Sequence, residues 1–129
     1  MYEMKDEYLT GIEFIDNEHR RLFEIADEVY ELSINEFIAD KYDNIREVLR
    51  ELREYTKLHF THEEEYMKSI NYKKMFSQII EHKEFVEKLD ELDIDSLDEN
   101  SDEMISEILD FLTNWLVNHI LYSDKQIGK

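Results

Sequence analysis

The scarcity of helix-breaking residues constrains this chain more than any other feature. Its 129 residues include no proline and two glycines, Gly11 and Gly128. Tight turns between β-strands lean on glycine and proline, and the same residues interrupt helices. The long interval between the two glycines therefore predicts an all-α fold.

Apolar residues recur at steps of three and four residues in four stretches, which predicts four helices. We expect these helices at roughly 17–38, 41–68, 73–92 and 101–124. Residues that favour the N-cap position precede or open them: Asp16, Asp40, Asn71 and Ser101. The polar segment 93–100 is expected to be a loop, and residues 1–15 an irregular arm. Long helices with short connections favour an antiparallel up-down four-helix bundle, formed by a single domain that spans 1–129.

Composition excludes several functional classes. The net charge of -18 argues against binding to nucleic acid or to anionic membranes, and the absence of cysteine excludes disulfides, thiolate zinc sites and iron–sulfur clusters. No apolar run approaches the roughly 20 residues of a membrane span, and the polar start is unlike a signal peptide. We expect a cytoplasmic protein.

The five histidines are distributed over all four expected helices: His19, His59, His62, His82 and His119. A metal site inside a bundle requires this distribution, because its ligands must converge from facing helices. The ordinary alternative for any single one is a surface position or a hydrogen-bonded place in the core.

Two carboxylates lie near histidines in sequence. His59 and Glu63 share one helix face, whereas the neighbouring Glu64 and Glu65 are expected on a solvated face. Asp124 follows His119 by five residues, about 140° around an ideal α-helix. It would reach the same face if the helix end tightens or frays, and would otherwise be a surface residue. Imidazole suits iron and carboxylates suit hard cations, so these residues indicate a metal site without identifying the metal or the number of ions.

Four blocks of residues, in order and with matching gaps, resemble the hemerythrin family, in particular its prokaryotic single-domain type. The first block contains Gly11-Ile12, Ile15-Asp16, His19 and Leu22-Phe23. The second contains His59-Phe60, Glu63-Glu64 and Met67. The third runs from Tyr72 to His82 and Phe85, and the fourth contains Trp115-Leu116, His119-Ile120 and Asp124.

The resemblance implies two iron ions, as Fe²⁺ or Fe³⁺, with a bridging oxo or hydroxo group, that bind dioxygen for transport, storage or delivery rather than for enzymatic turnover. It implies that His19 and His59 hold one iron, that His82 and His119 hold the other, and that Glu63 and Asp124 bridge them. His62 has no ligand role in the family and is expected at the surface. Candidates for the wall of the oxygen pocket, with ordinary core packing as the alternative, are Phe23, Phe60, Phe85 and Trp115.

One position departs from the family pattern. Gln78 stands where a further histidine ligand is expected, four residues before His82. The glutamine would ligate through its carbonyl oxygen, hold a water molecule, or leave a coordination position open. Because of this departure, other functions than oxygen transport remain open: oxidase, peroxide or nitric oxide chemistry, iron storage or oxygen sensing.

Two other classes remain, a signalling module that acts through a separate partner and a metal-free structural bundle. Dioxygen is the expected ligand, and the expected assembly is a monomer or a small homo-oligomer.

Overall fold

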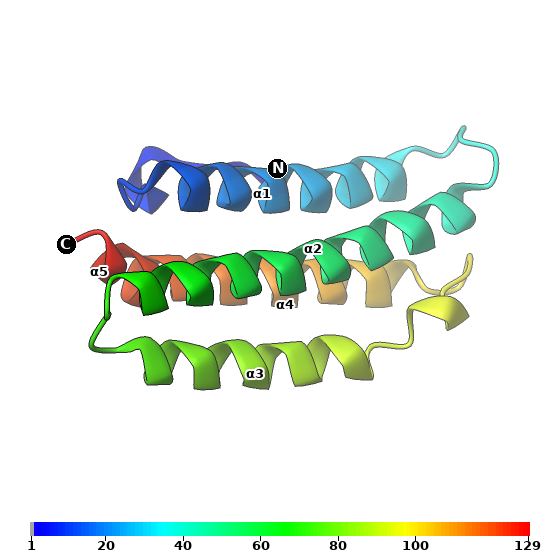
Figure 1. Ribbon diagram of the computed structural model, residues 1–129. Coiled ribbons are helices and arrows are strands. Elements are labelled where there is room, and N and C mark those ends of the chain that lie inside the picture. Colours follow the sequence, from blue (N-terminus) through cyan, green and yellow to red (C-terminus); the bar gives the residue numbers. More distant parts are fainter. Residues whose placement is uncertain (1) are drawn as a thin grey trace.

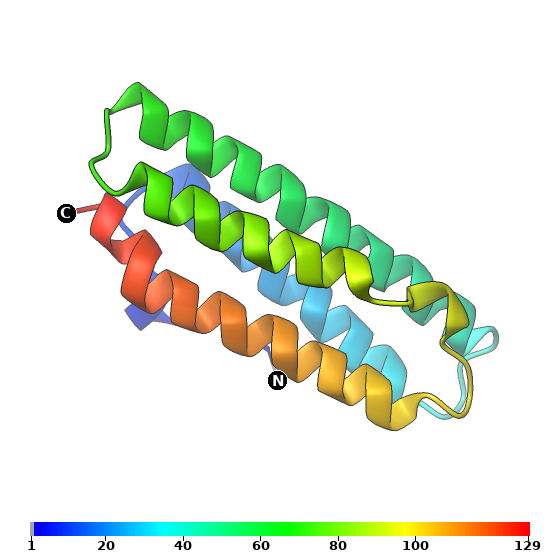
Figure 2. The ribbon, with the colours of Figure 1, turned by 90° about the horizontal axis from the view of Figure 1, so that it is seen from below.

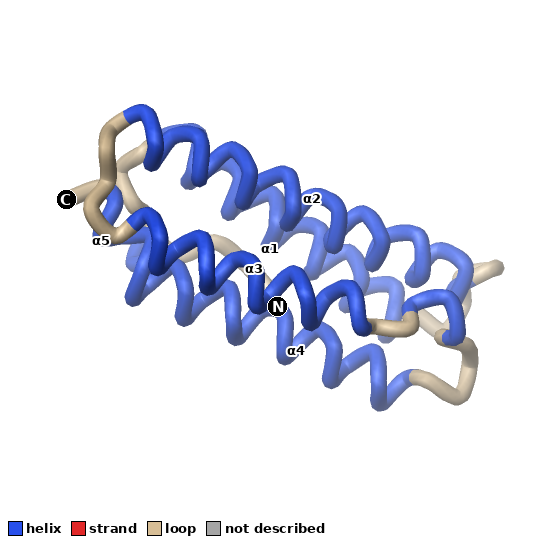
Figure 3. Tube along the Cα trace, turned by 60° about the horizontal axis from the view of Figure 1, so that its bottom comes forward, coloured by secondary structure: helices blue, strands red, loops and turns tan. Residues whose placement is uncertain are grey.

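Four long helices make up the computed structural model, which describes residues 2–129. They are α1 (Glu13–Ile34), α2 (Lys41–Ser69), α3 (Met75–Glu91) and α4 (Asp102–His119). Consecutive helices run in opposite directions and lie side by side (Figure 1), and the view from below shows the same arrangement (Figure 2). No strand occurs within residues 2–129, as the tube coloured by secondary structure shows (Figure 3). The expected all-α, up-down bundle is confirmed.

Four short elements complete the chain. A 3₁₀ turn, η1 (Asp6–Tyr8), lies in the N-terminal arm, and a second, η2 (Ile94–Ser96), lies in the acidic connection before α4. Beyond α4 the helix continues as a π-helical turn, η3 (Ile120–Asp124), and one α-helical turn, α5 (Lys125–Ile127). The last expected helix therefore contains a change of helix type.

The first helix begins three residues before the predicted N-cap, at Glu13 rather than Asn17. Asp16 does not cap it. Its carboxylate instead accepts hydrogen bonds from the Thr10 backbone and hydroxyl (both 2.8 Å) and from the Gly11 backbone (3.1 Å). Gly11 has a φ of 88°, which a residue with a side chain rarely adopts. Asp16 thus ties the arm to the helix. Met1, also assigned to the arm, lies outside the described residues.

The other predicted caps occupy helix ends without capping through their side chains. Asp40 and Ser101 stand at the N-cap positions of α2 and α4, but neither side chain bonds to a helix N–H group. The Ser101 hydroxyl instead accepts the Asp98 backbone N–H at 3.0 Å. Asn71 lies in the turn before α3 with a φ of 53°, and Lys74 is the N-cap residue. The first helix ends at Ile34, before the predicted 38.

The N-terminal arm and the last turn close one end of the bundle together. Tyr8 is buried and stacks on Phe23 of α1, with ring centroids 5.6 Å apart. Lys125 donates a hydrogen bond to the Glu7 carbonyl at 2.9 Å. A Cβ atom on Gly128 would lie 1.9 Å from the Thr10 carbonyl oxygen, so only glycine fits there. In Figure 1 this closed end carries the C terminus and the start of α1.

None of the helices within residues 2–129 combines the length and apolar character that a membrane crossing needs.

Candidate metal centre

All six predicted ligands lie together between the helices, near the closed end of the bundle. His19 comes from α1, His82 from α3 and His119 from α4; α2 supplies His59 and Glu63, and η3 supplies Asp124. Every one of these residues is buried, with at most 5% of its surface exposed. Six polar side chains thus lie together in the buried interior of the bundle, five from α1–α4 and one from the end of η3.

The six residues form two groups that share both carboxylates. One group contains His19 and His59, the other contains His82 and His119, and Glu63 and Asp124 belong to both. Within each group the potential ligand atoms lie within 4.8 Å of one another.

Each carboxylate directs one oxygen to each group. Glu63 Oε2 lies 3.0 Å from His59 Nε2, whereas Glu63 Oε1 lies 3.1 Å from His82 Nε2. Asp124 Oδ2 lies 3.1 Å from His19 Nε2, and Asp124 Oδ1 lies 3.1 Å from His119 Nε2. A carboxylate that faces two nitrogen pairs in this way can bridge two cations.

The unpaired atoms of the cluster test whether cations fit. Within residues 2–129, six buried atoms of the proposed ligands make no hydrogen bond: both ring nitrogens of His19, His59 Nε2, both oxygens of Glu63, and Asp124 Oδ2. Buried polar atoms that make no hydrogen bond are costly, and bound cations would satisfy them. Two ligand atoms about 2.1 Å from one ion and at right angles to each other lie roughly 3.0 Å apart. Five separations of 3.0–3.1 Å, including that between His82 Nε2 and His119 Nε2, agree with that spacing. The distances from Glu63 to His19 Nε2 and to His119 Nε2 are longer, at 3.7 and 4.0 Å.

The charges of the cluster are strongly coupled. Burial lowers the pKa of His19, but the carboxylates of Asp124 and Glu63 outweigh it and raise that pKa to about 9. Burial raises the pKa of Glu63, yet the neighbouring imidazoles of His19, His59 and His82 hold it well below its ordinary value. Without cations, protons on the imidazoles supply the positive charge that the carboxylates need.

Three further carboxylates orient the imidazoles, and their role was not predicted. Glu18 lies 2.8 Å from Nδ1 of His59, Glu64 lies 2.9 Å from Nδ1 of His82, and Glu81 lies 2.7 Å from Nδ1 of His119. A carboxylate on the outer nitrogen leaves Nε2 free to face a metal ion. Each of these glutamates is the sequence neighbour of a cluster residue on its own helix, and that adjacency was the available signal.

Two expectations about the surface therefore change. Glu64, expected to be solvated, has 31% of its side chain exposed and is bound to His82, because α2 and α3 pack side by side. His62 has 39% of its side chain exposed but also contacts Glu18, at 2.6 Å. Glu65 is exposed as expected.

The π-helical turn explains why Asp124 reaches the cluster. The sequence predicted that a tightened or frayed helix end would be needed. The structure shows the opposite distortion, because a π turn is wider than an α turn and its hydrogen bonds join residues five apart. Asp124 Oδ1 therefore comes within 3.1 Å of His119 Nε2, and Asp124 is fully buried.

Gln78 lies at the edge of the cluster and is 2% exposed. Its Nε2 donates to Asp124 Oδ1 at 3.2 Å, and its Oε1 is buried without a hydrogen-bond partner within residues 2–129. Because Oδ1 is the oxygen that faces His119, the amide stands on the side of the His82–His119 group.

The family model for the hemerythrin HHE cation-binding domain matches residues 10–129. The chain belongs to the hemerythrin family. It is 48% identical over 126 residues to a bacteriohemerythrin of Clostridium acetobutylicum, with 98% of each chain covered. It is 28% identical to a bacteriohemerythrin of Pseudomonas aeruginosa, over 93% of this chain and 74% of the relative.

Solved hemerythrin structures share the fold. A crystal structure of wild-type hemerythrin has a TM-score of 0.80 at 23% identity and covers 99% of this chain and 95% of its own. A structure of a Leu-to-Phe mutant has the same TM-score and identity, over 99% and 96%.

Aromatic rings cover the second histidine group of this hemerythrin-family chain. Phe60 stacks on His82, with centroids 3.9 Å apart and an interplanar angle of 1°. Trp115 stacks on His119 at 4.5 Å and on Phe85 at 3.9 Å. Of the four rings proposed for a pocket wall, Phe60 and Trp115 touch cluster imidazoles. Phe85 packs behind them, and Phe23 stacks on the N-terminal arm.

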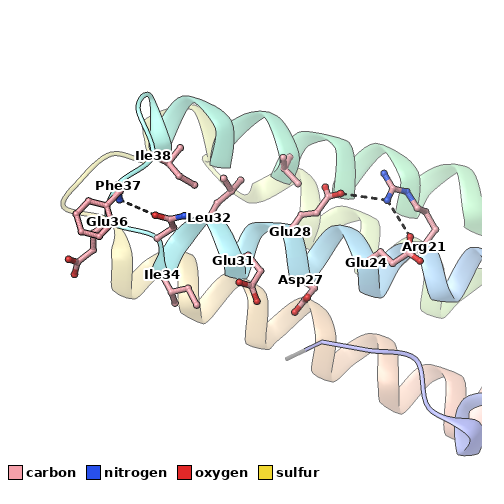
Figure 4. Close-up of a pocket in the computed structure, with 12 residues that line it drawn as sticks. Arg21, Glu24, Asp27, Glu28, Glu31, Leu32, Ile34, Glu36, Phe37 and Ile38 are labelled. Atoms are coloured by element: carbon pink, nitrogen blue, oxygen red, sulfur yellow. Dashed lines mark hydrogen bonds and ion pairs between the residues drawn. The ribbon is translucent and has the colours of Figure 1, made fainter.

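A wide pocket at the other end of the bundle is separate from the cluster. Its volume is about 980 Å³, and it lies where α1 leads into the connection to α2 (Figure 4). Acidic side chains of α1 and the apolar side chains of Leu32, Phe37 and Ile38 line it. None of the cluster residues lines this pocket, so it takes no part in the metal centre.

Proposed function

We propose that this protein binds a pair of iron ions and takes up dioxygen at them, as a carrier, store or deliverer of oxygen rather than an enzyme. The observation that carries this proposal is the pair of buried carboxylates, Glu63 and Asp124, each of which directs one oxygen to each histidine group. A site for one ion would need only one group.

The residues have distinct roles in this proposal. His19 and His59 would hold one ion, His82 and His119 the other, and Glu63 and Asp124 both. Donors that are all nitrogen and oxygen suit iron, and a bound ferrous pair would supply the electrons that dioxygen takes up. The chain's membership of the hemerythrin family supports the same assignment.

The other residues around the cluster would orient the imidazoles and exclude water from them. Glu18, Glu64 and Glu81 hold the outer nitrogens of three imidazoles, which fixes the direction of Nε2. Phe60 and Trp115 cover the imidazoles of the second group. Exclusion of water protects a bound oxidant from side reactions, and this favours binding over turnover.

Gln78 favours one alternative function. If Gln78 does not ligate, the second ion has fewer protein ligands than the family pattern implies. Exogenous molecules would then gain access to that ion, and oxidase or peroxide chemistry becomes the second candidate function. The specific observation is that the amide bonds to Asp124 and leaves Oε1 unpaired.

The experiment loads the protein with ferrous iron without air, counts iron per chain, admits oxygen and records the absorption spectrum. Two irons and a new band that disappears when oxygen is removed are the expected result. Steady consumption of oxygen or peroxide with a reductant would instead establish the enzymatic alternative. A chain that takes up no iron would refute both.

A further inference from the structure

A small polar pocket adjoins the cluster between the start of α3 and η3. Its volume is about 190 Å³, and its lining includes Lys74, Ser77, Gln78, Glu81, Tyr122 and Ser123. Tyr122 is 76% exposed, so the pocket meets the surface there. A water molecule has a share of about 30 Å³ in the liquid, so the pocket has room for a ligand of a few heavy atoms.

Gln78 connects this pocket to the metal centre. Within the described residues, two pocket-lining side chains bond to or pair with proposed ligands: Gln78 bonds to Asp124, and Glu81 lies 2.7 Å from His119 Nδ1. The buried Oε1 of Gln78 has no partner on either side. The amide contacts Asp124 Oδ1, which faces His119, so the pocket approaches the His82–His119 position.

The opposite wall is built by the π turn. Ser123 donates to Glu81 at 3.0 Å, and Glu81 in turn lies 2.7 Å from His119 Nδ1. The turn that lowers Asp124 into the cluster therefore also shapes the pocket. Lys74 adds a positive charge to the lining, and Glu81 adds a negative charge that Ser123 and His119 already contact. The serine and tyrosine hydroxyls add hydrogen-bond donors.

We propose that this pocket admits a small anion from solvent to the second metal position and that Gln78 is the positioning residue at its inner end. A glutamine side chain has three rotatable bonds and both donates and accepts hydrogen bonds, whereas an imidazole ligand at position 78 would occupy the coordination place itself. This inference rests on the proposed function, because it requires the second ion to be bound.

The test uses azide as the probe, with the oxidised, iron-loaded full-length protein. Iron per chain is measured first, then the number of azide ions bound per iron pair by absorption titration and the association rate by stopped flow. Wild type is compared with Gln78→His, Gln78→Ala and Ser77→Phe. Ile80→Phe is the matched control, because it adds the same ring at an exposed position of α3 outside the pocket lining.

We expect wild type and Gln78→Ala to bind one azide more than Gln78→His. Ser77→Phe should keep the wild-type number but slow the association of that additional azide at least tenfold, while Ile80→Phe behaves as wild type. Equal numbers in wild type and Gln78→His overturn the proposal. So does an additional azide in Gln78→Ala over wild type, which would make Gln78 itself a ligand, or an unchanged rate in Ser77→Phe.

The iron count separates this test from that of the proposed function. A wild-type chain without an iron pair overturns both proposals before azide is added. A chain with two irons and no difference between the variants overturns the pocket alone.

Discussion

His119 and Asp124 face the same point because a single π-helical turn separates them, with His119 Nε2 3.1 Å from Asp124 Oδ1. In a continuous α-helix the two side chains would diverge by about 140°. The position of Asp124 between the two histidine groups thus depends on one local change of helix type near the end of the fourth helix.

Replacing this carboxylate tests its place in the centre. We expect Asp124→Ala to reduce bound iron from two ions per chain to one or none, because both histidine groups lose an oxygen donor. Iron analysis after gel filtration measures the loss. Glu107→Ala, at an exposed position of α4, is the matched control and should retain both ions. Full iron content in Asp124→Ala would contradict the bridging role.

Metal removal should destabilise the fold. A ligand that binds only the folded chain at 100 times its dissociation constant stabilises it by about 2.7 kcal/mol. We therefore expect a chelator to lower the melting temperature of the iron-loaded protein, measured by circular dichroism, and added ferrous iron to restore it without air. The Asp124→Ala variant should show a much smaller change. Identical melting curves with and without iron would support a metal-free structural bundle.

The outer carboxylates should strengthen metal binding without touching the ions. Glu18 contacts both His59 and His62. Glu18→Ala should weaken metal affinity by about 10–100-fold, because His59 loses the group that orients its ring. Glu31→Ala, at an exposed position of the same helix, is the control. Competition with a chelator of known affinity measures both variants, and equal affinities would remove Glu18 from the supporting set.

Metal affinity should rise with pH. The pKa of His19 in the metal-free site is about 9, above its ordinary 6.5, so the imidazole is protonated at neutral pH and a cation must displace that proton. This group alone contributes about a tenfold gain in apparent affinity per pH unit, and the gain ends as pH passes 9. Calorimetric titration in buffers of different ionisation enthalpy measures the released protons. An affinity that falls with rising pH, or a binding reaction that releases no protons, would contradict this expectation.

Gly128 should be sensitive to the addition of one methyl group. Gly128→Ala places a Cβ atom against the Thr10 carbonyl oxygen, so the arm or the last turn must move, at a cost of about 1–3 kcal/mol. Urea unfolding of the metal-free protein measures the free energy of unfolding. Lys129→Ala, at the exposed neighbouring position, should be neutral. A stability of Gly128→Ala equal to wild type would show that the two segments separate readily.

Periodicity and composition predicted the four helices and their antiparallel order, because an amphipathic helix carries its own 3.6-residue signal. The convergence of His19, His59, Glu63, His82 and His119 followed from their helix faces and from family resemblance. Their role as metal ligands remains a prediction. The burial of Asp124 could be predicted only from resemblance, because a π turn leaves no periodic signature.

The remaining differences arise from contacts between segments distant in sequence. Aspartate favours the N-cap position, but the carboxylate of Asp16 accepts hydrogen bonds from the preceding arm, because Thr10 and Gly11 fold back on it. Glu64 belongs to a run of three glutamates that indicates a solvated face, yet α3 brings His82 within 2.9 Å. Such pairings depend on how helices pack, and local sequence does not encode them.

The contact of Gly128 with Thr10 has a kinetic consequence. The N-terminal arm and the last turn contact each other at the end of the bundle that holds the cluster, and Lys125 donates a hydrogen bond to the Glu7 carbonyl. Fraying of the last turn would open this end locally, so we expect it to offer bound cations a route beside the pocket at Gln78. The exchange half-life of bound ions should then depend on the strength of a backbone contact between residues outside the set of proposed ligands.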